Sequence, residues 1–199
     1  MITELVLVSH APTSATRTPS FPLDEPIEDA GSVHLELPRF DHGLCAPSRA
    51  AQETARILGL DVVVTPALRD ADHGAWAGRR LDEVAIADSE LFAAWVSDPG
   101  AAPPGGESVL ELIARVGGWI DGRVAVPGTT VAVTHAAVIR AALVHAVDAG
   151  APAFWHYDVG PLTAVVLRGD GRRWMLRALT PRPGNRREGP GEGRPVVRR

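Results

Sequence analysis

The chain has 199 residues, enough for one domain that buries a substantial core without disulfides or bound metal. Its formal charge is -4 at pH 7, and all 20 basic residues are Arg, whose planar guanidinium suits bidentate recognition of phosphate or carboxylate. The acidic balance argues against a general nucleic-acid binder. The single cysteine, Cys45, excludes an internal disulfide and any multi-cysteine zinc site.

Targeting and membrane signals are absent from the sequence. No basic region precedes the N-terminal apolar run, and no apolar stretch reaches the roughly 18 to 20 residues of a membrane span. We therefore expect a cytoplasmic protein with no membrane partner. The sequence leaves a homodimer open.

Short apolar strands alternate with helical patterns along the chain. We expect strands near 2–9, 61–65 and 129–134, and helices near 48–58, within 80–97, over 108–122 and near 137–148. Residues 162–168 and 173–179 read as a hairpin joined across a Gly-Asp-Gly turn. This order predicts an α/β fold, a three-layer α/β/α sandwich with a mixed, mostly parallel sheet.

The last residues differ in composition from the rest. Residues 181–199 are rich in Pro, Gly and Arg and contain hardly any apolar side chains, so they cannot bury enough surface to offset their ordering entropy. We therefore expect one domain over residues 1–180, followed by a disordered tail over 181–199.

Two histidines occupy matching positions in this pattern. His10 follows the apolar run Leu5–Ser9, and His135 follows the run Thr130–Thr134. Ligands of open α/β sheets bind at the carboxyl ends of the strands. A histidine there can act as a nucleophile or carry a proton near neutral pH. The pair therefore predicts a site for one small ligand.

Two segments between the histidines add candidates. Pro47 and Ser48 can open a helix, which places Arg49 in a first turn where an anion is favoured. Asp70, in the loop from Leu68 to Gly78, is a candidate proton donor. Glu107 and Asp72 are alternatives for that role, since a loop aspartate is often only a turn former.

Taken in order, these segments resemble the histidine phosphatase superfamily, the phosphoglycerate mutase-like proteins. Leu7–Thr13 matches the family's Leu-Val-Arg-His-Gly-Glu-Thr strand end, and Cys45–Ala55 its Ser-x-x-x-Arg-Ala-x-x-Thr-Ala segment. The family's Leu-x-Glu-x-x-x-Gly-x-Trp-x-Gly, Gly-Glu-Ser and second-histidine segments are matched by three further stretches of this sequence, Leu68–Gly78, Pro104–Ser108 and Val133–Arg140.

The resemblance implies a metal-independent phosphohistidine mechanism with no cofactor. His10 would attack phosphorus, Arg49 and His135 would hold the phosphoryl oxygens, and Asp70 would protonate the leaving oxygen. The remaining histidines show no ligand spacing such as His-Glu-x-x-His, so we expect no metal site.

The chain departs from the family pattern at several positions. Ser9 replaces the arginine before the nucleophilic histidine, Pro12 an acid or amide, and Ala11 and Ala136 glycines. Losing a donor comparable to that arginine costs about 3–4 kcal/mol of transition-state stabilisation. Ser9 can still donate one hydrogen bond, and Arg17 on the following loop is a candidate replacement. The expected phosphate-binding set is therefore Ser9, Arg17, Arg49 and Ala136.

The preferred function is hydrolysis of a small phosphate monoester through His10. A phosphatase is favoured over a mutase because the segment between Trp76 and Gly105 is short and leaves little lid to exclude water. Two alternatives stay open. One is a degenerate member that binds a small anionic metabolite or a partner protein without turnover, and the other is an enzyme that uses the same pocket for different chemistry.

Overall fold

The computed structural model describes residues 3–180, and the expected tail over 181–199 lies outside the described residues. One six-stranded sheet organises the molecule, with the strand order β3-β2-β4-β1-β5-β6. The strands are β1 (Thr3–Ser9), β2 (His42–Cys45), β3 (Val63–Val64), β4 (Gly128–Thr134), β5 (Ala164–Gly169) and β6 (Trp174–Thr180).

The sheet is mixed, as predicted. Strands β1 to β4 pair in parallel, whereas β5 pairs antiparallel with both β1 and β6. The expected hairpin at the sheet edge is therefore confirmed. Strand β2 was missed, because a four-residue segment that contains His42 and Gly43 carries too little apolar signal to stand out.

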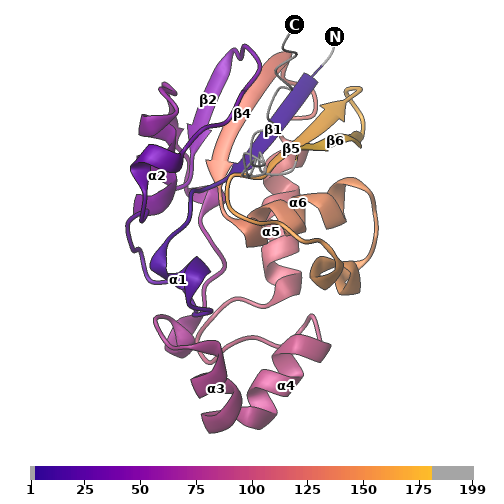
Figure 1. Ribbon diagram of the computed structural model, residues 1–199. Helices are drawn as coiled ribbons and strands as arrows, with labels where there is room; N and C mark the ends of the chain where they lie inside the picture. Colours follow the sequence, from indigo (N-terminus) through magenta and orange to yellow (C-terminus); the bar gives the residue numbers. More distant parts are fainter. Residues whose placement is uncertain (1–2, 181–199) are drawn as a thin grey trace, which may run out of the picture.

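The helices cover both sides of the sheet (Figure 1). The helices, in chain order, are α1 (Ser14–Arg17), α2 (Arg49–Ile57), α3 (Leu81–Ala87), α4 (Ser89–Ser97), α5 (Val109–Asp121) and α6 (Ala136–Ala146). Short 3-10 turns stand at Ala30–Ser32, Pro66–Leu68, Gly74–Trp76 and Ala151–His156. A capping box forms between Ser108 and Glu111 at the start of α5.

The main core lies around the two central strands. Residues Leu5–Val8 of β1 and Val131–Val133 of β4 are at most 1% exposed, since helices cover both faces of this parallel part of the sheet. A separate cluster of Phe21, Trp76 and Val84 packs beneath α3 and α4. In Figure 1 these two helices stand apart from the sheet, beyond the carboxyl ends of its parallel strands.

Within residues 3–180, no helix is long and apolar enough to cross a membrane.

Candidate active site

The two predicted histidines meet at the carboxyl ends of adjacent strands. Strands β1 and β4 pair in parallel with Ser9 opposite Thr134, so the next residue on each strand, His10 and His135, leaves the sheet at the same point. Their ring centroids are 5.1 Å apart in an edge-to-face arrangement. The strand register thus creates the pair that the sequence pattern predicted.

His10 is held in a form suited to nucleophilic attack. Its Nδ1–H donates to the carbonyl oxygen of Ala11 at 2.8 Å, which leaves the lone pair on Nε2. Burial, and next the charge of His135, lower the pKa of His10 below its ordinary value. The ring therefore remains neutral at neutral pH.

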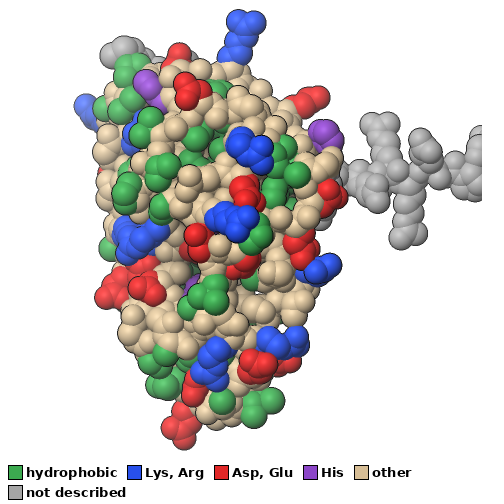
Figure 2. Space-filling model, turned by 90° about the vertical axis from the view of Figure 1, so that its left-hand side faces the viewer, with side chains coloured by type: hydrophobic (Ala, Val, Ile, Leu, Met, Phe, Trp, Pro, Cys, Tyr) green, Lys and Arg blue, Asp and Glu red, His purple; other side chains and the backbone are tan. Residues whose placement is uncertain are grey.

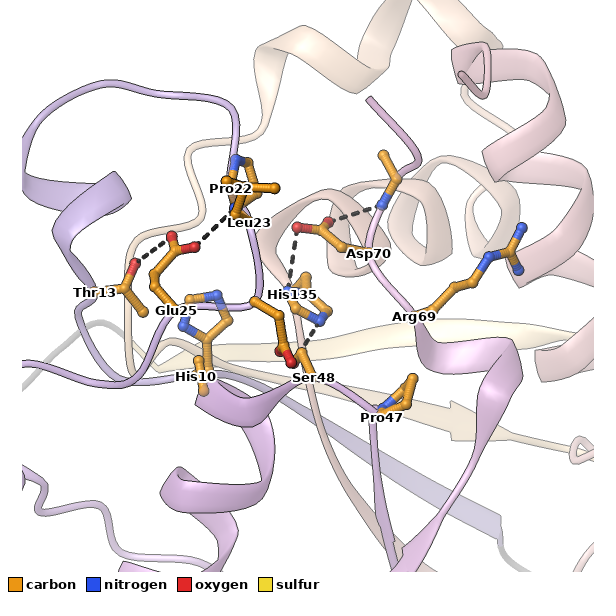
Figure 3. Close-up of a pocket in the computed structure, with 13 residues that line it drawn as sticks. His10, Thr13, Pro22, Leu23, Glu25, Pro47, Ser48, Arg69, Asp70 and His135 are labelled. Atoms are coloured by element: carbon orange, nitrogen blue, oxygen red, sulfur yellow. Dashed lines mark hydrogen bonds and ion pairs between the residues drawn. The ribbon is translucent and has the colours of Figure 1, made fainter. Parts of the chain in front are cut away.

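His135 lies between a hydroxyl and a carboxylate (Figure 3). Its Nε2 is 3.0 Å from Ser48 Oγ, and its Nδ1 is 3.2 Å from Asp70 Oδ2. The ring is 5% exposed. Ser48 caps α2, where its hydroxyl also accepts a long bond of 3.4 Å from the amide of Ala51. One row of polar side chains thus runs from Ser48 at the start of α2, through His135 after β4, to Asp70 in the loop after Pro66–Leu68.

Asp70 is held in its ionised form. Burial alone would raise its pKa, but the charge of the nearby His135 ring and the amide of Ala71 outweigh this effect, so the pKa lies well below its ordinary value. An ionised carboxylate orients His135 well. Because it carries no proton, Asp70 is a weaker proton donor than the general acid predicted from the sequence.

Ser9 is turned away from the cavity. Its hydroxyl donates to the carbonyl oxygen of Gly160 at 2.6 Å and accepts from the amide of Thr163 at 2.9 Å. The side chain is 2% exposed. The structure therefore uses Ser9 to attach the segment before β5 to β1.

The structure does not bring Arg49 or Arg17 to the histidines. The Nε of Arg49 donates to Glu53 at 2.8 Å, and its side chain is 58% exposed. Arg17 pairs with Glu28 at 2.6 Å and is 73% exposed. Ala50, the residue after Arg49, lines the cavity instead.

The spacing of residues within Cys45–Ala55 explains why Arg49 does not face the cavity. The family pattern separates its arginine from its threonine by four residues, whereas Arg49 and Thr54 are five residues apart. With Thr54 aligned, Ala50 takes the arginine's place. Thr54 itself is fully buried and accepts a bond from the amide of Ala11 at 2.9 Å.

Two helices begin at the cavity. Ala136 and Ala137, in the first turn of α6, line it on one side, and Ser48 and Ala50 of α2 line it on another. Amides in a first turn have no acceptor within their own helix, and the helix dipole favours negative charge there. Ala136 can therefore serve the expected phosphate through its backbone.

More carboxylates surround the cavity than the sequence predicted. Asp24 and Glu25 line it, and Asp24 accepts from the amide of Arg49 at 2.5 Å. The guanidinium of Arg69 points away from the histidines in Figure 3 and lies 3.4 Å from Glu107. Arg140 lines the wider part, where its Nε donates to the carbonyl oxygen of Tyr157 at 2.9 Å.

Glu107 and Asp72, the two alternatives to Asp70 as proton donor, bind other groups. Glu107 accepts from Arg115 at 2.6 and 2.8 Å through both oxygens, and Asp72 accepts from the amide of Gly74 at 2.9 Å. Sequence reasoning missed Ala50, Arg140 and the carboxylates of Asp24 and Glu25. Ala50 and Arg140 lie on α2 and α6 within segments that match the family pattern, and a count back from Thr54 would have found Ala50. No motif marks Asp24 and Glu25, and only the path of their loop brings them to the site.

The cavity has two connected parts that share His10, Asp70 and His135. The part beside Ser48 has a volume of about 350 Å³, and the part beneath α3 and α4 about 440 Å³. Figure 2 shows a hollow on one face between the larger body and the end built from these helices, with a histidine visible inside it. Among residues 3–180, no group of three or more His, Cys, Asp or Glu side chains is arranged to hold a metal ion.

Comparisons with known proteins agree with this geometry. The profile of the histidine phosphatase superfamily (branch 1) matches residues 5–181. The chain belongs to the histidine phosphatase superfamily. A solved structure from Escherichia coli, a proposed alpha-ribazole-5'-P phosphatase, superposes with a TM-score of 0.80 at 26% identity, over 90% of this chain and 96% of that one.

Two curated relatives define the similarity further. An adenosylcobalamin/alpha-ribazole phosphatase from Salmonella typhimurium is 29% identical over 159 residues, which cover 75% of each chain. A bifunctional protein of Mycobacterium tuberculosis is 36% identical over 135 residues, 63% of this chain. The matched region spans only 37% of that longer relative.

Proposed function

We propose that this protein is a metal-independent phosphatase that hydrolyses a small phosphate monoester through a phosphohistidine on His10. The observation that carries the proposal is the neutral His10, whose Nδ1–H is bound to Ala11 and whose Nε2 is free to attack beside His135. Family membership and the phosphatase names of two similar proteins support it.

The reaction would proceed in two steps. Nε2 of His10 attacks phosphorus in line, the ester oxygen leaves, and water then hydrolyses the phosphohistidine. Negative charge on the transferring group would be held by the first-turn amides of α6 at Ala136 and Ala137, by His135 and by the guanidinium of Arg140. The Nδ1–H bond to Ala11 would keep the attacking nitrogen aimed at the cavity.

The state of Asp70 suggests a preference among leaving groups. Because its pKa is held low, Asp70 would chiefly orient His135 and would protonate a leaving alkoxide slowly. Phosphates of acidic alcohols, such as phenols, would therefore react fastest. The protein would act on a small phosphorylated metabolite in the cytoplasm, with residues 1–180 as its one domain.

The test is the hydrolysis of p-nitrophenyl phosphate and of a panel of small phosphate monoesters, with chelator present. His10→Ala should lose about 10³-fold or more of the rate. The control is His34→Ala, which removes an exposed histidine that lines neither part of the cavity. Rapid quenching should trap a phosphoryl adduct on His10 that survives alkali and is lost in acid. Equal rates for the parent protein and His10→Ala would overturn the proposal.

A second candidate function is binding of an anionic metabolite without turnover. Ser9 and Ala50 favour it, because neither supplies the guanidinium that the family pattern has at these positions. The same panel decides between the two. Tight calorimetric binding of a phosphorylated ligand, with no turnover of any monoester, would establish the second candidate.

A further inference from the structure

Ser48, His135 and Asp70 form a row in which Ser48 has no role in phosphohistidine chemistry. The Ser48 hydroxyl lies 3.0 Å from His135 Nε2, and Asp70 Oδ2 lies 3.2 Å from Nδ1 of the same ring (Figure 3). Nδ1 lies within ion-pair distance of Asp70 but makes no aligned hydrogen bond there. The carboxylate charge favours a hydrogen on Nδ1, and in that tautomer Nε2 is the acceptor for the Ser48 O–H. This is the order of contacts by which a histidine activates a serine.

From this geometry we infer a second activity, hydrolysis of a neutral carboxylic ester with Ser48 as the nucleophile. The inference does not rest on the phosphatase proposal, since His10 forms no bond in it. Its residues come from the start of α2, the loop after the 3-10 turn Pro66–Leu68 and the end of β4.

The steps balance as an acyl transfer to water. Ser48 Oγ attacks the ester carbonyl carbon while its proton passes to His135 Nε2. The tetrahedral intermediate collapses, the carbon–oxygen bond to the alcohol breaks, and His135 returns the proton to the leaving oxygen. Water, deprotonated by His135, then attacks the acyl carbon, the bond to Ser48 Oγ breaks, and His135 returns the proton to Oγ as the acid is released. Asp70 stays ionised and stabilises the imidazolium in both halves.

The start of α2 offers a donor for the developing oxyanion. Ala50 lines the cavity, and its amide in the first turn has no acceptor among the described residues. The amide of Arg49 donates to Asp24, and that of Ala51 reaches Ser48 only at 3.4 Å. A carbonyl oxygen above Ser48 would meet the positive end of this nine-residue helix.

The part of the cavity beside Ser48 favours an uncharged group. The carboxylates of Asp24, Glu25 and Asp70 face the part beside Ser48, whereas the guanidinium of Arg69 is turned toward Glu107. These charges oppose a phosphate dianion and leave a neutral ester unaffected.

The wider part of the cavity has room for an apolar acyl group. Its volume is about 440 Å³, and it opens directly beside His135 and Asp70. Large apolar side chains line it, among them Phe21, Trp95, Leu112, Phe154, Trp155 and Val159. Burial of each methylene of an acyl chain there strengthens binding. Esters with four to eight acyl carbons should therefore exceed acetate in kcat/KM.

The experiment compares hydrolysis of p-nitrophenyl butyrate by the parent protein, Ser48→Ala and Ser48→Gly. Both variants should lose about 10²-fold or more of the rate above background. Glycine is almost as good a helix cap as serine, so Ser48→Gly separates loss of the nucleophile from loss of the cap. Ser97→Ala, which removes an exposed hydroxyl on α4, is the matched control and should keep the parent rate.

A covalent probe supplies a second readout. A fluorophosphonate should phosphonylate Ser48 Oγ with release of fluoride, and peptide mapping by mass spectrometry should place the adduct on that residue. His135→Ala should slow the labelling at least tenfold. Equal ester hydrolysis by the parent and both Ser48 variants, or an adduct on His10 with none on Ser48, would overturn the inference. The phosphatase proposal has its own variant, His10→Ala, so failure of one leaves the other standing.

Discussion

Ala50 lines the cavity beside His10 and His135, whereas the guanidinium of its neighbour Arg49 extends along α2 to Glu53. Consecutive side chains on a helix are separated by about 100° around its axis. A shift of one residue therefore decides which side chain faces the site. A methyl group stands where a cation would complete a phosphate site.

Restoring that cation should strengthen phosphatase activity. In Ala50→Arg, a guanidinium at the cavity wall should raise kcat/KM for p-nitrophenyl phosphate at least tenfold, because a single donor to the transferring group can be worth 10²–10³-fold, or about 3 kcal/mol. Gln52→Arg adds the same charge on the exposed side of α2 and serves as the control. A rate unchanged by Ala50→Arg would contradict this account of the missing charge.

The same geometry makes a prediction for Arg49. Because its side chain is exposed and paired with Glu53, Arg49→Ala should lower kcat/KM for the aryl phosphate by less than about threefold, well short of the loss expected for a phosphate donor. A loss of 10²-fold would show instead that Arg49 leaves Glu53 and binds the substrate. Steady-state kinetics of the purified variant distinguish the two.

Asp24 occupies the anion position at the start of α2. Its Oδ1 accepts from the amide of Arg49 at 2.5 Å, so the protein supplies its own negative charge where a phosphate would bind. Asp24→Asn should therefore lower the inhibition constant of inorganic phosphate several-fold. The variant should also lose about 0.3–1 kcal/mol of stability, the usual worth of a charge at a helix end. Asp98→Asn, at the end of α4, is the control, and weaker phosphate inhibition in Asp24→Asn would refute the idea.

The fold and part of the site could be predicted from the sequence. Strand periodicity located β1 and β4, and their parallel register then brings His10 to His135, so this pair follows from local pattern alone. Ser48 was recognised only as a helix cap. Its contact with His135 spans 87 residues of chain and depends on how α2 packs against β4. Asp24 and Glu25 enter the cavity from a loop whose path no periodicity encodes.

The pH dependence of phosphatase activity should report on His10. Burial lowers its pKa, so the nucleophile stays neutral below the ordinary value of 6.5. The acidic limb of kcat/KM should therefore fall below pH 6.5. The free energy of unfolding should also fall as the pH is lowered. Between the two pKa values the unfolded chain binds more protons, so stability falls as pH drops from 6.5 toward the folded value.

The matched variant is His10→Asn, which removes the titrating group. Chemical denaturation of both proteins between pH 5 and pH 7 should show a weaker pH dependence in the variant. An acidic limb centred above 6.5, or the same slope in both proteins, would contradict the assigned state of His10.

The ion pair of Arg115 with Glu107 holds the loop that presents Asp70. Arg115 is 14% exposed, and it also donates to the carbonyl oxygens of Ala67, Arg69 and Asp70, at 2.8, 3.1 and 3.2 Å. Arg115→Met would leave the Glu107 carboxylate, itself 9% exposed, with only its long contact to Arg69 at 3.4 Å, and should cost about 3 kcal/mol of unfolding free energy. Arg17→Met, which breaks an exposed pair, should cost at most about 1 kcal/mol. Urea unfolding measures both changes. Because the carbonyl contacts fix the Asp70 loop, Arg115→Met should also slow turnover under conditions where the protein remains folded. A destabilised variant with full activity would show that the Arg115 contacts do not position Asp70.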